Sequence, residues 1–243
     1  MELVFSDEAL AIVVPIAAYW VCSSMYMALG RSMDEYRLHP RDEERSKNLV
    51  SKRDVVKGVV LQQLVQAAVA AIIFTLTGGS TATAAGTQQG TTCRTCVTVV
   101  LQVTVGKAVL DGWQYAWHRY MHRNKFMYRH VHSWHHRLVL PYAFGVQYNH
   151  PVEGLLDTVG GALAFLASGM SSRVSIFFFM LCAIKGVDAH CGLWLPGNPR
   201  AGRYNFSQPF FVTWDKVFGT HMPYVVEHRP QGGLHVRPME ALS

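Results

Sequence analysis

The sequence predicts an all-α, polytopic membrane protein whose helices form a bundle, and three observations support this fold class. Only 16% of its 243 residues are charged, whereas soluble domains contain about 25% charged residues. The apolar residues are gathered into long uncharged runs. Clusters of histidines follow these runs at spacings of three and four residues, which place side chains on one face of a helix.

The first uncharged run, residues 9–30, is long enough to cross a bilayer, because a spanning helix needs roughly 20 apolar residues. A secretory signal would begin with basic residues, but Asp7 and Glu8 precede this run, so we interpret it as a retained membrane helix. The second run, residues 58–93, also qualifies. Gln62, Gln63 and Gln66 in this run leave open the alternative of a buried helix in a soluble domain.

The charged residues predict how the chain is oriented. The net charge is +6, and basic residues cluster in residues 31–57, between the first two runs. The next polar segment, residues 78–96, is rich in small residues and has only Arg94 as a charge. Because positive residues stay on the cytoplasmic side, the 31–57 loop is predicted to be cytosolic and the 78–96 loop lumenal. Acidic residues within the basic loop argue against nucleic acid as a partner.

Cys93 and Cys96 are the only close pair among the five cysteines, and they fall in the predicted lumenal loop. One such pair cannot build a structural zinc site without other ligands. A disulfide and two free thiols both remain open, and we assign the pair no function.

A third apolar run, residues 95–106, predicts a helix that continues through His118 and His122. Asp111 falls on the same face of this helix, seven residues before His118. Residues 1–110 are therefore predicted to contain the membrane helices and their two loops. The first histidine pair leaves the membrane on the cytosolic side.

Two shorter uncharged runs, residues 158–172 and 174–184, are each short for a full span. We expect them to form a helical hairpin, residues 158–184, that dips into the bilayer and returns before Asp188 and His190. All histidine clusters would then lie on one side of the membrane, at its surface.

The spacing of the histidines predicts a metal site. Imidazole is the commonest metal ligand among side chains, and a second short helix is expected to carry His132, His135 and His136. Since neighbouring residues project about 100° apart on a helix, His135 and His136 could reach two different ions. Ligating histidines need an acceptor for the other ring nitrogen. Asp111 could provide it, or could be a helix-end charge.

Histidine-rich sites without carboxylates suit iron, copper or zinc. A zinc hydrolase would need a carboxylate base, and no paired carboxylate accompanies these histidines. A location at the lipid surface favours a substrate with an alkyl chain. Oxygen activation at iron for cleavage of a C–H bond fits these facts.

The chain resembles the membrane fatty acid hydroxylase superfamily, which carries His-x3-His and His-x2-His-His motifs, and within it the plant-type sphingoid-base C4-hydroxylases (sphinganine C4-monooxygenases). The resemblance covers nearly the whole chain. It rests on the following segments: Tyr36-Arg-Leu-His39, Asn48-Leu-Val-Ser-Lys52, Val55-Val-Lys-Gly58, Asp111-Gly-Trp-Gln-Tyr-Ala-Trp-His118-Arg-Tyr-Met-His122, His132-Ser-Trp-His-His136, Tyr148-Asn-His150-Pro-Val-Glu-Gly154, Asp188-Ala-His190-Cys-Gly-Leu-Trp-Leu-Pro196, Asn205-Phe-Ser-Gln-Pro-Phe-Phe211 and Trp214-Asp-Lys-Val-Phe-Gly-Thr220.

The resemblance implies a di-iron monooxygenase of the endoplasmic reticulum, with residues 111–243 as its catalytic region and the histidines facing the cytosol. Such an enzyme hydroxylates C4 of sphinganine or dihydroceramide, giving phytosphingosine or phytoceramide. Its electrons come from NADPH or NADH through cytochrome b5 and its reductase. The ligands carried over are His118, His122, His132, His135, His136 and His190, with His150 as a weaker candidate that could equally be structural. Asp111 and Asp188 are expected to support these ligands.

One departure from the family concerns a third histidine motif, expected between the segments that contain Pro196 and Asn205. The chain runs Gly-Asn-Pro-Arg-Ala-Gly-Arg-Tyr there and lacks the motif. His221, His228 and His235 lie seven residues apart and cannot replace it at helical spacing. A non-catalytic membrane homologue, or a subunit in a homo- or hetero-oligomer with a complete paralogue, is therefore the second hypothesis. Another lipid substrate, such as a sterol, is the third.

Overall fold

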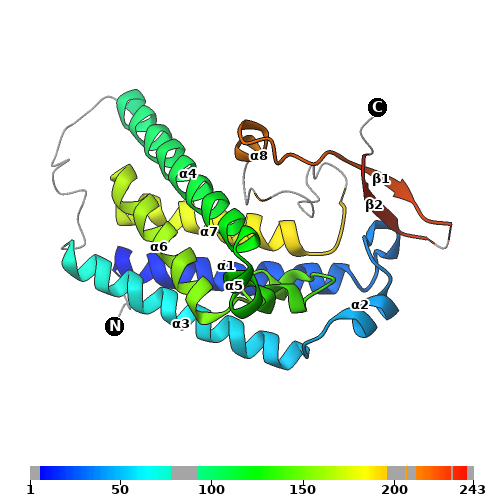
Figure 1. Cartoon of the computed structure of the whole chain (residues 1–243). Helices are drawn as coiled ribbons and strands as arrows, with labels where there is room; N and C mark the ends of the chain where they lie inside the picture. Colours follow the sequence, from blue (N-terminus) through cyan, green and yellow to red (C-terminus); the bar gives the residue numbers. More distant parts are fainter. Residues whose placement is uncertain (1–5, 78–91, 196–205, 207–211, 231, 240–243) are drawn as a thin grey trace.

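Five long helices make up most of the described chain (Figure 1). The computed structural model describes residues 6–77, 92–195, 206, 212–230 and 232–239. The long helices are α1 (Asp7–Leu29), α3 (Lys52–Leu76), α4 (Thr92–Arg123), α6 (Pro151–Ser168) and α7 (Ser172–His190). The predicted helical bundle is thereby confirmed.

Three of these helices, α1, α3 and α4, are long and apolar enough to cross a membrane. Many of their large apolar side chains point outward, including Val21, Leu64, Leu76 and Val100. A soluble protein would bury such side chains, so their exposure fits helices surrounded by lipid. The chain is a membrane protein, as its composition predicted.

Helix α4 runs without a break from Thr92 to Arg123, which confirms that the third apolar run continues through both histidines of the first pair. The predicted lumenal loop, residues 78–96, extends too far at its C-terminal end, because residues 92–96 belong to α4. Residues 78–91 lie outside the described part of the chain. Cys93 and Cys96 are exposed free thiols on the first turns of α4, so the disulfide alternative is not supported.

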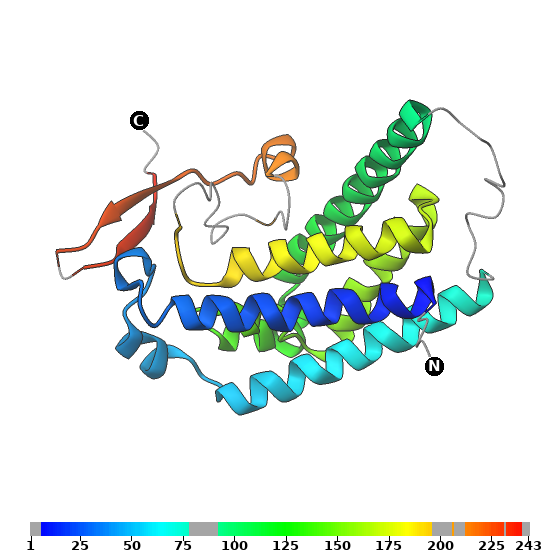
Figure 2. The same ribbon diagram turned by 180° about the vertical axis from the view of Figure 1, so that it is seen from behind.

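The predicted hairpin corresponds to α6 and α7, which reverse direction at Gly169 in a left-handed conformation with φ of 61°. The two helices are longer than the uncharged runs and belong to different layers. Helix α6 packs mainly against α4 and α3, whereas α7 lies along α1 (Figures 1 and 2). An ion pair of 2.7 Å between Arg173 Nε and Asp7 Oδ2 joins the first turns of α7 and α1.

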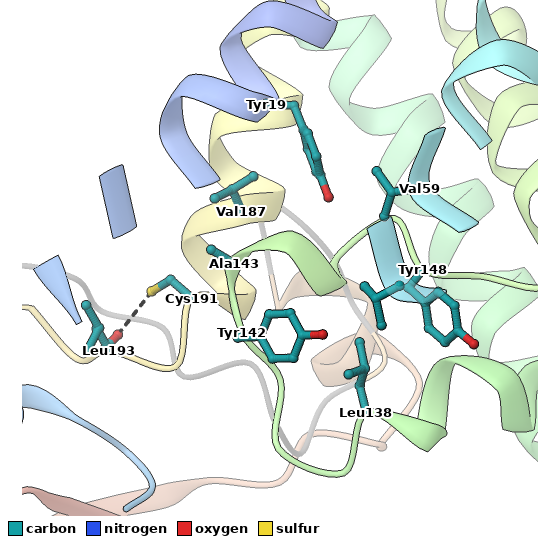
Figure 3. Packing of buried hydrophobic residues seen from close by; sticks show 10 residues of the cluster. Tyr19, Val59, Leu138, Tyr142, Ala143, Tyr148, Val187, Cys191 and Leu193 are labelled. Atoms are coloured by element: carbon teal, nitrogen blue, oxygen red, sulfur yellow. Dashed lines mark hydrogen bonds between the residues drawn. The ribbon is translucent and has the colours of Figure 1, made fainter. Parts of the chain in front are cut away.

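A buried cluster holds the segment after the second histidine group beneath α1, α3 and α7 (Figure 3). Tyr19 and Val59 pack there with Ala143, which belongs to the short 3-10 helix η4 (Ala143–Gly145). The Tyr19 hydroxyl donates to the Phe144 carbonyl oxygen at 2.7 Å. The same cluster includes Tyr148, whose carbonyl oxygen lies 3.3 Å from His135 Nδ1, so this packing fixes one backbone partner of the histidines.

Shorter elements gather at one end of the bundle. They are η1 (Asp34–Tyr36), α2 (Arg41–Lys47), α5 (Lys125–His130), η3 (His132–Arg137), α8 (Thr213–Val217) and the antiparallel strands β1 (Tyr224–His228) and β2 (Leu234–Pro238). The small β-hairpin was not predicted. The Leu49 amide donates to the Arg137 carbonyl at 2.9 Å, so the basic loop and the histidines share this end. Which side of the membrane it faces stays a prediction.

Candidate metal centre

Four histidines converge where α4 meets η3. The Nε2 atom of His122 lies 3.2 Å from that of His118, 2.9 Å from that of His132 and 3.3 Å from that of His136. The Nε2 atoms of His132 and His136 are 3.0 Å apart. All four donor atoms lie within 4.8 Å of one another. Two helical segments thus direct two imidazoles each to a common point.

The local sequence explains why the imidazoles of α4 and η3 converge. His118 and His122 are one helical turn apart, so their rings meet edge to face on the same face of α4, with centroids 4.8 Å apart. The chain then reverses at Asn124, whose side-chain oxygen caps α5 by accepting from the amides of Phe126 and Met127. This reversal brings η3 back against the end of α4.

The opposite ring nitrogens are held by acceptors. His118 Nδ1 lies 3.0 Å from the carbonyl oxygen of Phe206, and His132 Nδ1 lies 2.8 Å from Oε1 of Glu153. A carbonyl oxygen and an ionised carboxylate can only accept, so Nδ1 of His118 donates its proton to Phe206, and Nδ1 of His132 donates to Glu153 when that carboxyl group is ionised. The Nε2 atom of each ring then presents a lone pair, which is the arrangement found in ligating histidines.

Electrostatics favour neutral imidazoles in this cluster. Burial lowers the pKa of His132 to about 4. Burial, together with the neighbouring histidines, lowers the pKa of His136 to about 3. Near neutral pH, converging neutral rings direct lone pairs at one another, which is unfavourable unless a cation lies between them. Four of the Nε2 separations are 2.9–3.3 Å and all four atoms lie within 4.8 Å of one another, so one metal ion could be bound by several of these nitrogens.

His135 and His190 form a second pair beside this cluster. Their ring centroids are 5.7 Å apart. His135 Nδ1 lies 3.3 Å from the Tyr148 carbonyl oxygen, and His190 Nδ1 lies 3.0 Å from the Gly186 carbonyl oxygen. Each Nε2 is thereby the nitrogen that can bind a metal. The His135 ring also lies 6.0 Å from that of His132 and 5.9 Å from that of His136, so its binding to a different ion from His136 stays a prediction.

Three other candidate residues lie apart from these histidines. His150 caps α6, where its Nδ1 accepts from the Val152 amide at 3.2 Å. Asp188 accepts from the Tyr26 hydroxyl and pairs with Lys185, both at 2.7 Å. Asp111 is buried on α4. The acceptors paired with His118 and His132 are Phe206 and Glu153 instead.

Sequence reasoning did not single out Glu153, although it stands in the motif that begins at Tyr148. Its side chain is buried, and burial raises its pKa to about 7. A carboxyl group in the first turn of an otherwise apolar helix was the available signal. Its partner, His132, is 21 residues away in sequence, and only folding brings them together.

A cavity of about 300 Å³ extends from the histidines into the membrane part of the bundle. Side chains of α1, α3, α4, α6 and α7 line it, and it reaches His118, His132 and His135. A long, largely apolar cavity that ends at a cluster of metal-binding side chains suits an alkyl chain whose reacting carbon lies beside the metal.

The helical membrane fold and the convergent imidazoles suit a membrane enzyme with a metal site, and sequence comparison identifies the family. The fatty acid hydroxylase family matches residues 103–220. The chain belongs to this family, as its motifs indicated.

Among similar proteins, Sphinganine C4-monooxygenase 2 of Arabidopsis thaliana is 52% identical over 99% of this chain and 98% of its own length. Sphinganine C4-monooxygenase 1 of the same plant is 53% identical, over 98% and 96% of the two chains. Very-long-chain aldehyde decarbonylase GL1-9 of Oryza sativa subsp. indica is 48% identical, over 96% of both. No solved structure matches the chain.

Proposed function

We propose that this protein hydroxylates C4 of a sphingoid base, either as free sphinganine or within dihydroceramide. The observation that carries the proposal is the four-imidazole cluster at the end of a cavity between membrane helices. The 52% identity to Sphinganine C4-monooxygenase 2 along nearly the full chain supports the choice of reaction.

We infer that iron occupies the site, as two ions. His118, His122, His132 and His136 would hold one ion, because their Nε2 atoms already converge. His135 and His190 would contribute to the other. Bound iron supplies the activation of oxygen that a C–H hydroxylation requires.

The chain's own residues orient the imidazoles and exclude water. Glu153 and the Phe206 carbonyl hold the ring protons of His132 and His118 on Nδ1, which keeps each Nε2 free for metal. The apolar cavity walls admit the alkyl chain and keep bulk water from it. The overall reaction consumes one O₂, two electrons and two protons. One oxygen atom enters the C–H bond at C4 and the other leaves as water.

We further propose that the two electrons come from NADPH or NADH through cytochrome b5 and its reductase, at the cytosolic face of the endoplasmic reticulum. The resemblance to sphingoid-base hydroxylases supports this donor. The basic loop between α1 and α3 lies at the same end as the histidines, and the rule that positive residues stay cytoplasmic supports the orientation.

The missing third histidine motif favours one alternative, a non-catalytic homologue or subunit that works beside a complete paralogue. Among the residues that the structure describes, four histidines surround the first metal position, whereas His135 and His190 alone form the second group. A protein with a single metal position could keep the fold and the lipid cavity without hydroxylating.

Expression in a host that lacks C4-hydroxylation distinguishes an active hydroxylase from a non-catalytic homologue. Phytosphingosine or phytoceramide in the lipid extract is the result expected of the enzyme, and it should disappear in a His122→Ala variant. Folded protein without product in the presence of reductant would refute the activity. Metal analysis of the purified protein then separates the readings further, since two irons per chain would contradict the non-catalytic alternative. A methylsterol and a long-chain aldehyde, offered in the same assays, test other substrates.

A further inference from the structure

The cavity beside the histidines has two chemically different ends. Its far end, near the first turns of α1 and the last turns of α3 and α6, is apolar and includes Ala11, Ile73, Phe74 and Phe165. Its near end carries polar side chains from α3, α4 and α6. They are Gln62, Gln66, Gln114, Trp117, Glu153 and Asp157. The described lining contains no lysine or arginine.

Two of the polar groups at the near end have no partner among the described residues. The Oε1 atom of Gln114 and the Nε1 atom of Trp117 are both buried without a hydrogen bond, as is Oε2 of Glu153, whose other oxygen binds His132. Most buried polar groups in native proteins are paired, and an unpaired one lowers stability. An acceptor and a donor left open on a cavity wall therefore indicate a ligand that supplies the opposite groups.

Their position on α4 relates these two groups to the metal centre. Gln114 is one helical turn before His118, which at 1.5 Å per residue is about 6 Å along the helix. Trp117 immediately precedes His118, and its ring stacks on Tyr120 with centroids 5.2 Å apart. Gln114, Trp117 and His118 all line the cavity, so a ligand bound to the first two lies next to the histidines.

We propose that Gln114 and Trp117 bind the polar head group of the lipid and so determine which carbon reaches the metal centre. The proposal rests on the proposed function. Gln114 Oε1 accepts from a hydroxyl or amine of the head group, and Trp117 Nε1 donates to a hydroxyl oxygen. In a sphingoid base the hydroxyl-bearing C3 is bonded to C4. Holding the C3 hydroxyl therefore places C4 within one bond of a fixed point, while the tail fills the apolar end. Both residues are positioning residues.

Ligand binding tests the proposal without requiring activity. Purified protein is loaded with labelled sphinganine, which is then displaced by unlabelled sphinganine or by octadecylamine, an amine of equal chain length without hydroxyl groups. We expect the wild type to prefer sphinganine at least about tenfold, the effect of one buried group left unpaired. A Gln114→Leu substitution keeps the volume of the side chain, removes the acceptor and should reduce this preference severalfold. Trp117→Phe keeps an aromatic ring, removes the donor and should do the same.

The matched control is Gln102→Leu, the same substitution elsewhere on α4. Gln102 Nε2 donates to the Gly169 carbonyl at 2.8 Å, away from the histidines. This variant should lower thermal stability and leave the preference for sphinganine unchanged. If Gln114→Leu fails to fold, the Trp117→Phe variant decides with the same measurement.

A wild type that binds both ligands equally, or folded variants that keep the full preference, would overturn the proposal. In hydroxylating protein, Gln114→Leu should also yield product hydroxylated at carbons other than C4, which a purely structural residue would not cause. A wild type that prefers sphinganine but forms no product contradicts the proposed hydroxylation and leaves the head-group site supported.

Discussion

Removing the negative charge of Glu153 should weaken metal binding at the four-histidine cluster without unfolding the protein. Glu153 Oε1 accepts from His132 Nδ1 at 2.8 Å, and the His132 side chain is only 1% exposed. The carboxylate raises the basicity of Nε2 and holds the ring in place. In a Glu153→Gln variant, an amide oxygen can still accept the proton, but the charge is lost.

The magnitude follows from measured effects of such partners, which change metal affinity by about 10- to 100-fold. Glu153→Gln should fall at the lower end, near tenfold or about 1.4 kcal/mol. Glu153→Ala leaves the buried His132 N–H without this acceptor and should reach about 100-fold, or about 2.7 kcal/mol. Titration of the purified protein with a competing chelator, followed by metal analysis, measures both affinities.

Asp157→Asn provides the matched control on the same helix. Asp157 lies one turn after Glu153 and accepts from the Asn149 side chain at 3.0 Å. Burial raises the pKa of Asp157 to about 8, so the side chain is mostly uncharged near neutral pH. Its substitution should leave metal affinity within about twofold, since it binds the Asn149 amide and not a ligand ring. Equal losses in Glu153→Gln and Asp157→Asn, or no loss in Glu153→Ala, would refute the reasoning.

Four further substitutions test packing and the histidine assignments. Gly160→Ala would place a Cβ 2.4 Å from Cδ1 of the Trp113 ring, so we expect a loss of about 1–3 kcal/mol and a lower Tm. Gly161→Ala meets only ordinary contacts and should keep the wild-type Tm; equal Tm values for the two variants would contradict this packing. His122→Ala should abolish metal binding at the cluster, whereas His150→Ala should retain the metal and lose about 1 kcal/mol of stability with its helix cap. Loss of the metal from the His150→Ala variant would instead indicate that His150 is a ligand.

Local sequence was sufficient to predict the helices and the identity of most histidines in the site. Uncharged runs of apolar residues predict α1, α3 and α4, because a helix in lipid must satisfy its own backbone hydrogen bonds. The four-residue spacing predicts that His118 and His122 share a face, since this depends only on helical geometry. The same reasoning placed His135 and His136 in different directions.

Contacts between segments far apart in the chain could not be predicted from local sequence. The interpretation of His150 left a structural role open, and its helix cap depends on where α6 begins. Asp188 ties α7 to α1 through Tyr26, a contact that its sequence neighbours did not indicate, and its support of the ligands stays a prediction. Glu153 was overlooked, because its pairing with His132 depends on how α6 packs near η3.

The sequence by itself determined a membrane bundle, a metal-binding chemistry and the family to which the chain belongs. These follow from composition, periodicity and motifs, which act over a few residues. Only the tertiary structure decided which imidazoles converge, that the His135 ring lies beside that of His190, and that Gln114 and Trp117 line the cavity. The physical reason is that these relations arise from packing between helices far apart in the chain, where burial and unpaired polar groups depend on all the neighbours at once.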